Sequence, residues 1–141
     1  MLEAVYLALF NWAQDLSGYH VEGPYPNVVM VSHQWLEDTA CGGNKCNVLG
    51  LYRTDGNVYL DKSLNVADDT YASGVLVHEF VHHLQYVTRA FNNENQGCQE
   101  YVKKEKEAYA IQNIFMEKKG DFYRHSRPPF IHCGDEPSAA N

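Results

Sequence analysis

Residues 78–82 read HEFVH, the pattern H-E-x-x-H. On a helix, positions four apart lie about 40° apart around the axis and roughly 6 Å along it, so His78 and His82 can reach one metal ion from the same face. Glu79 is not a ligand in this pattern, but its carboxylate can reach a metal-bound water. A metal that lowers the pKa of that water toward ~7 would make Glu79 a competent base. The alternative is a pair of ordinary surface histidines without a metal.

A catalytic zinc site needs a third protein ligand and an open fourth position. A long metzincin-type motif is excluded, because the third His that it requires would stand at the position of Thr88. The run EKEAY, which begins at Glu105, offers Glu105 and Glu107 instead. These two residues are two apart, so only one of them can face the metal. We expect the other to be a solvated surface charge.

Two helices are predicted to position these residues. The first runs from residue 71 to about 88, and Asp68, Asp69 and Thr70 offer its N-capping oxygens. Its broad apolar face leads us to expect that the two histidines project away from most of the core. The second helix covers about 98–118 and ends at Gly120. If the two helices are antiparallel and joined by a short loop, the glutamates lie beside the histidine pair.

The rest of the chain predicts a further helix and a small sheet. Apolar residues recur at helical spacing over residues 2–17, and the β-branched run 28–31 suits a buried strand. Residues 48–53 and 57–61 flank an Asp-Gly turn and predict a hairpin. We therefore expect an α+β fold in a single domain over residues 1–141, with a flexible tail after about 134.

Composition limits the class of protein. The chain has 141 residues, 45% of them hydrophobic and 13% aromatic, which fits one folded domain rather than a disordered chain. Its formal net charge of −7 disfavours binding to nucleic acid or to an anionic membrane surface. The longest apolar run, residues 4–10, is far shorter than the ~20 residues that span a bilayer.

Four cysteines suggest an oxidising compartment. We expect the disulfides Cys41–Cys46 and Cys98–Cys133, and from them a secreted or periplasmic protein. No signal peptide is visible, so a leader was removed before this numbering begins or the chain is cytosolic. The alternatives to disulfides are free thiols and a structural zinc site made by all four cysteines, although neither pair has the usual C-x2-C spacing.

The segments HEFVHHLQ and EKEAYAIQ together resemble the gluzincin zinc metallopeptidases, and more narrowly short, poorly characterised bacterial domains of that clan. The resemblance covers about a quarter of the chain. It implies a zincin-like domain with a short, mostly antiparallel sheet, and Zn²⁺ held by His78, His82 and Glu105. In this family an Asp or Asn four residues after the ligand Glu usually orients a ligand His. This chain has Tyr109 there, which puts that orienting contact in doubt.

The resemblance also implies an activity, the hydrolysis of peptide bonds in peptide or protein substrates, with Glu79 as general base. We expect an endopeptidase rather than an exopeptidase. In gluzincins an edge strand before the active-site helix holds an extended peptide, which would be strand 58–60 here; a simple core hairpin is the alternative. The tetrahedral intermediate needs a further donor. The candidates are Tyr101, Tyr109, Tyr123, Arg124, His125 and His132.

Two other functions are compatible with the same residues. The first is a catalytically weak or inactive module that binds zinc and peptide. The second is a deformylase-like amidase in which Cys46 replaces the Glu ligand, which a Cys41–Cys46 disulfide would exclude because ligation requires a thiolate. His20 and His33 have no partner pattern, and we expect them to be surface or turn residues. Oligomeric state and cleavage specificity are not encoded in any recognisable pattern.

Overall fold

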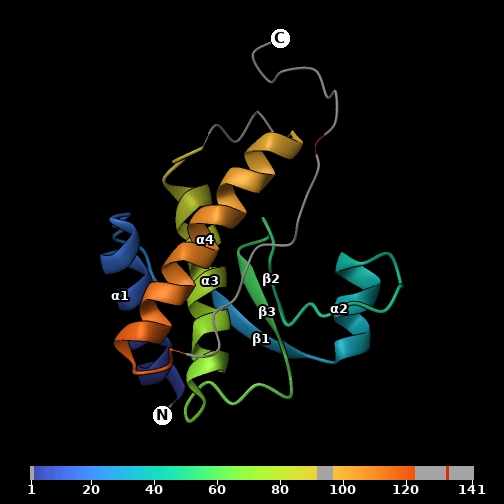
Figure 1. Cartoon of the computed structure of the whole chain (residues 1–141), viewed down its shortest axis with the longest axis horizontal. Helices are drawn as coiled ribbons and strands as arrows, with labels where there is room; N and C mark the ends of the chain where they lie inside the picture. Colours follow the sequence, from blue (N-terminus) through green and yellow to red (C-terminus); the bar gives the residue numbers. More distant parts are fainter. Residues whose placement is uncertain (1, 92–96, 123–132, 134–141) are drawn as a thin grey trace.

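The computed structural model describes residues 2–91, 97–122 and 133 (Figure 1). The α+β class is confirmed, because the described residues form four helices and one small three-stranded mixed sheet. In chain order the elements are α1 (Leu2–Ser17), β1 (Asn27–Val31), α2 (His33–Ala40), β2 (Gly50–Tyr52), β3 (Asn57–Asp61), α3 (Thr70–Val87) and α4 (Cys98–Lys118). The three long helices predicted from the sequence are all present with nearly the predicted ends.

Helix α3 lies in the middle of the molecule, with α1 and α4 on one side and the sheet on the other (Figure 1). It begins where the sequence predicts, because the Asp69 carboxylate accepts hydrogen bonds from the backbone N–H groups of Tyr71 and Ala72. Helix α4 runs antiparallel to α3 and packs along it (Figure 1). The core residues of α3 are buried against these neighbours, and Leu76, Phe80 and Leu84 are fully buried.

The sheet is mixed, so the prediction of a mostly antiparallel sheet is wrong. Its strand order is β1-β3-β2. Strand β2 pairs with β3 in antiparallel register through the predicted hairpin, but β1 pairs with β3 in parallel, from Asn27 opposite Asn57 to Val31 opposite Asp61. The cause is the connection between them, because the chain leaves β1, passes through α2 and returns before it enters the hairpin. Parallel strands need such a crossover.

Strand β3 is therefore central, and residues 58–60 are not the edge that the family resemblance implies. Both sides of β3 are hydrogen-bonded to neighbouring strands, so no peptide can pair with it. Val58 and Leu60 are fully buried beneath the helices. The outer strand β1 is less buried than predicted, because Val29 and Met30 are 37% and 41% exposed.

Helix α2 was not predicted from the sequence. It begins after Ser32, whose hydroxyl accepts a hydrogen bond from the backbone N–H of Trp35. The Trp35 ring stacks on Tyr59 of β3, with 4.6 Å between the ring centroids. Because side chains alternate along a strand, Tyr59 points away from its buried neighbours. Helix α2 therefore packs on the sheet face opposite α3.

Both predicted disulfides are present. Cys41–Cys46 closes the loop after α2, and Cys98–Cys133 joins the start of α4 to the later chain. No cysteine is free, so the alternatives of free thiols and an all-cysteine zinc site are wrong. The tail after about 134 lies outside the described residues. In the described part of the chain, no helix is both long and apolar enough to cross a bilayer.

Candidate metal centre

His78 and His82 of α3 meet Glu105 of α4, the glutamate that the family resemblance implies. The Nε2 atom of His78 lies 3.1 Å from Glu105 Oε1, and the Nε2 atom of His82 lies 2.8 Å from Glu105 Oε2. The two Nε2 atoms are 3.1 Å apart. Antiparallel packing of α3 and α4 creates this meeting, because it sets one turn of α4 against the two histidines. The three residues form a group whose ligand atoms could hold one metal ion.

The spacing of these atoms fits a shared ion. In a tetrahedral site with bonds of about 2.0–2.1 Å, two ligand atoms lie roughly 3.3 Å apart. The separation of the two Nε2 atoms, 3.1 Å, is close to that value, and each Nε2 atom lies within 3.1 Å of a different oxygen of the Glu105 carboxylate. Two imidazole nitrogens and a carboxylate oxygen also form a donor set that suits a divalent transition metal. The residues present therefore fit a metal ion.

The histidines are more enclosed than the sequence suggests. His78 is only 5% exposed, and His82 is half-buried. The expectation that both project away from most of the core is therefore wrong. The apolar face of α3 packs on the sheet and α1, as expected, but α4 covers the remaining side. The ligands lie in the interface between the two helices.

Two buried glutamines orient the imidazoles. The Nδ1 atom of His78 lies 2.9 Å from Gln112 Oε1, and the Nδ1 atom of His82 lies 2.8 Å from Gln85 Oε1. An amide oxygen can only accept, so each Nδ1 carries the proton and donates it. Each ring therefore turns Nε2 toward Glu105. Such contacts fix the tautomer of a metal ligand and raise its basicity.

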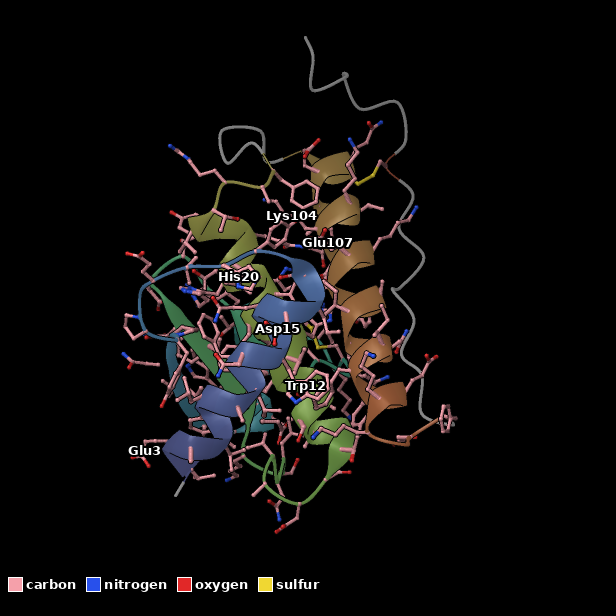
Figure 2. The ribbon with its side chains drawn as sticks, turned by 90° about the vertical axis from the view of Figure 1, so that its left-hand side faces the viewer. Glu3, Trp12, Asp15, His20, Lys104 and Glu107 are labelled. Atoms are coloured by element: carbon pink, nitrogen blue, oxygen red, sulfur yellow. A yellow bond between two sulfur atoms is a disulfide. The ribbon has the colours of Figure 1, made fainter. Side chains whose placement is uncertain are left out.

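Glu107 is not part of the metal group, and it is not the solvated charge that was expected. Its carboxylate accepts a hydrogen bond from the Tyr19 hydroxyl, 2.8 Å from each oxygen, and another from Gln85 Nε2 at 3.0 Å. Figure 2 shows Glu107 on α4, beside the blue segment that follows α1. Of the two candidate glutamates, Glu105 faces the histidines and Glu107 faces α1.

Charges in the group are strongly coupled. Burial opposes ionisation of Glu105, but hydrogen bonds from His78 and His82 outweigh it and lower the pKa of the Glu105 carboxyl. Burial also opposes protonation of His82, but the hydrogen bond to Glu105 and the nearby charge of Glu79 raise the pKa of His82 to about 9. The site thus favours a positive charge between the imidazoles and the carboxylate. A metal ion that binds there must displace the proton.

Glu79 lies on the sheet side of the same group. It is 6% exposed, and burial raises the pKa of its carboxyl, while the charges of His78 and His82 and a hydrogen bond from the backbone of Tyr52 lower it. Strand β2 passes close to this side chain. A Cβ at Gly50 would lie 3.0 Å from Glu79 Cγ and 3.1 Å from Oε2, so the position accommodates no side chain without a shift.

Tyr109 is the one candidate donor whose ring contacts a ligand among the described residues. Its ring centroid is 4.4 Å from that of His78. Burial and the charges of Glu105 and Glu79 raise the pKa of Tyr109 to about 12, so its hydroxyl keeps its proton. Tyr101 is 52% exposed. The other candidates lie outside the described residues: Tyr123, Arg124, His125 and His132.

Cys46 is bound to Cys41 and supplies no thiolate, so the deformylase-like interpretation is wrong. Gln85 and Gln112 were also not identified from the sequence as residues that orient the two histidines. Helical spacing carried a signal for both, because Gln85 is three residues after His82 and Gln112 is two turns after Glu105. No family model, curated protein or solved structure matches this chain.

Proposed function

We propose that this protein is a zinc-dependent peptidase in which His78, His82 and Glu105 hold Zn²⁺ and Glu79 is the general base. One observation carries the proposal: two imidazole nitrogens and a carboxylate converge from two helices, with a second, buried carboxylate, that of Glu79, beside them. Three protein ligands with an open fourth position are typical of catalytic rather than structural zinc sites. The donor set of two His and one Glu supports zinc.

Bound zinc would supply a Lewis acid that polarises the substrate carbonyl and makes a water nucleophilic near neutral pH. Glu79 would accept the proton of the attacking water and deliver it to the leaving amine. Burial supports this role, because it raises the pKa of Glu79 and makes its carboxylate a stronger base. Gly50 and the backbone of Tyr52 restrict the position of that carboxylate.

Tyr109 would donate a hydrogen bond to the oxygen that becomes negative during the reaction. Its contact with the His78 ring and its high pKa support this role. Removal of one such donor lowers kcat by about 10²–10³ in other hydrolases. We expect a similar loss for Tyr109→Phe, with zinc affinity unchanged.

The substrate would be an extended segment of a peptide or protein. Strand β2 is an outer strand of the described sheet and runs beside Glu79. A peptide that adds to its open edge would place its backbone next to the zinc ligands, which is how many proteins bind extended chains. The two disulfides support a secreted or periplasmic location for this activity.

The test uses protein purified without added zinc, followed by metal analysis and incubation with a diverse peptide pool. We expect about one zinc per chain and cleavage that mass spectrometry can map. Glu79→Gln should retain zinc and lose at least ~10²-fold in cleavage rate, because it removes the base without touching a ligand. Glu100→Gln on α4 is the matched control, since it removes an equal charge far from the ligands, and it should cleave normally. An intact pool with fully zinc-loaded protein would contradict the peptidase and favour the binding module.

A further inference from the structure

We propose that Glu107 is a positioning residue for the metal centre. It fixes the side-chain amide of Gln85, and through that amide it holds His82 in the tautomer that presents Nε2 to the metal. This inference rests on the proposed metal site and adds a residue that does not touch it. Glu107 is two residues after Glu105, the proposed ligand. It contacts Gln85 of α3 and Tyr19, which follows the end of α1.

The orientation of the Gln85 amide is determined by its surroundings. Its nitrogen donates to the backbone carbonyl of Lys104 and to Glu107 Oε1, both at 3.0 Å. Both partners are acceptors, so a flipped amide would set its oxygen against a carbonyl and a carboxylate. Gln85 is 1% exposed, which leaves no water to compensate such a flip. The amide oxygen therefore points to His82 Nδ1.

The orientation of the Gln85 amide in turn determines the tautomer of the His82 imidazole. The Nδ1 atom of His82 lies 2.8 Å from the amide oxygen of Gln85, so it must donate a proton. In the opposite neutral tautomer the proton would be on Nε2. The lone pair of His82 Nδ1 would then face a lone pair of the Gln85 amide oxygen. That tautomer cannot bind a metal through Nε2. The amide thus disfavours the form of His82 that does not bind.

Glu107 accepts hydrogen bonds from both sides, from Gln85 and from Tyr19. His82 donates to Gln85, Gln85 donates to Glu107, and Tyr19 donates to Glu107 from the opposite side. Burial and the hydrogen bond with Glu107 raise the pKa of Tyr19 to about 12, so the phenol remains a donor. Hydrogen bonds to an ionised acceptor are stronger than neutral ones. A carboxylate that touches no metal therefore polarises the imidazole.

The molecule contains an internal reference for this effect. His78 is held by a different glutamine, Gln112 of α4, whereas His82 is held by Gln85. A disturbance that spreads from Glu107 should therefore change His82 and leave His78 as it was. General loosening of the α3–α4 interface would change both.

The experiment compares Glu107→Ala, Glu107→Gln and Tyr19→Phe with the control Glu100→Ala, which removes the same charge from the same helix. Zinc affinity is measured by competition with a chromogenic chelator. The proton on each imidazole is located by long-range ¹H–¹⁵N NMR of the zinc-free and zinc-loaded proteins. Far-UV circular dichroism checks that each variant is folded, and Glu107→Gln, which keeps the shape of the side chain, replaces Glu107→Ala if the latter does not fold.

We expect Glu107→Ala to weaken zinc binding by ~10–100-fold, as for other residues that orient a ligand. Tyr19→Phe should weaken it less, and Glu100→Ala not at all. The ¹⁵N signals should show His82 losing its uniform Nδ1–H form while His78 keeps it. An affinity within twofold of the original, with unchanged His82 signals, would overturn the proposal; so would equal changes at both histidines. If the unaltered protein binds no zinc, the metal site itself is wrong.

Discussion

Two histidine groups in this molecule use the same kinds of atom in opposite arrangements. Between α3 and α4, the Nε2 atoms of His78 and His82 and the carboxylate of Glu105 converge on one point. Beside the sheet, the two nitrogens of a single ring, His33, point to acceptors on opposite sides: Asp61 Oδ2 at 2.7 Å from Nδ1, and the Cys46 carbonyl at 2.9 Å from Nε2.

The two groups differ in the kind of positive centre that can bond to all of their acceptor atoms. Converging acceptors need one centre of positive charge with several bonding directions, which a divalent cation supplies. Diverging acceptors are satisfied by two N–H groups on one ring, which is the protonated imidazole. The group around His33 also includes Glu37, whose Oε2 is 3.4 Å from Nε2. The same residue type therefore belongs to one group that could hold a metal ion and to another that suits a protonated ring.

The largest expected effect is the loss of the converging group. Glu105→Ala removes the carboxylate that bridges the two histidines, so zinc affinity should fall by more than ~100-fold, beyond the range for residues that only orient ligands. Chelator competition measures it. His33→Ala removes a histidine of the other group and should leave zinc affinity unchanged. If zinc binding depended equally on both groups, the distinction between them would be wrong.

Removal of the metal should lower thermal stability. An ion that binds only the folded chain, at 100 times its Kd, stabilises it by about 2.7 kcal/mol, which for a domain of this size corresponds to a Tm shift of about 9 °C. Differential scanning fluorimetry with and without a strong chelator measures this shift. Glu105→Ala should show no difference between the two conditions. A chelator effect that persists in this variant would point to metal bound elsewhere.

The loop next to His33 should contribute to stability without affecting the metal. The double variant Cys41→Ser/Cys46→Ser opens a short loop, and chain entropy gives a cost of about 2 kcal/mol. Urea unfolding measures this loss. Zinc affinity should not change, because neither cysteine belongs to the metal group. A parallel loss of zinc would show that the two regions are coupled.

The smallest expected effect is a pH dependence at His33. Hydrogen bonds to Asp61 and to the Cys46 carbonyl raise the pKa of His33 above its ordinary value of ~6.5. Its stabilising contribution is therefore complete below ~6.5 and is lost as the pH rises through the folded value. NMR titration of the ring protons should give a midpoint above ~6.5, and His33→Gln should remove the pH dependence. A midpoint at or below the ordinary value would contradict the proton assignment.

Hydrophobic periodicity and capping residues were sufficient to predict α1, α3 and α4, because these helices are long and their signals are local. The i, i+4 spacing likewise predicted that His78 and His82 lie on the same face of one helix. The choice between Glu105 and Glu107 depended on how α4 is rotated against α3, which the sequence alone does not determine. The role of Gln85 depended on the Lys104 carbonyl, a backbone contact that side-chain spacing does not encode.

The sheet and its surroundings were harder to predict for a different reason. Helix α2 has only eight residues, too few for a helical pattern to be recognised with ease, although Ser32 carried a capping signal. Because α2 was not predicted, no crossover connection between β1 and β3 was expected, and the parallel pairing of these two strands could not be deduced. The surface position expected for His33 is consistent with a side chain that is 41% exposed, but its partner Asp61 is distant in sequence and could not be predicted.

Gly74 limits how far the stability of α3 can be raised by substitution. A glycine inside a helix costs about 1 kcal/mol relative to alanine, so Gly74→Ala is the substitution that local helix energetics recommends for α3. A Cβ at that position would lie 3.0 Å from Met116 Sδ and 3.4 Å from Gln112 Cγ. The Met116 side chain would have to shift, in the same contact where the amide of Gln112 holds His78. Gly74 thus lets α3 and α4 approach closely at the place where Gln112 holds His78, at the cost of a weaker helix propensity.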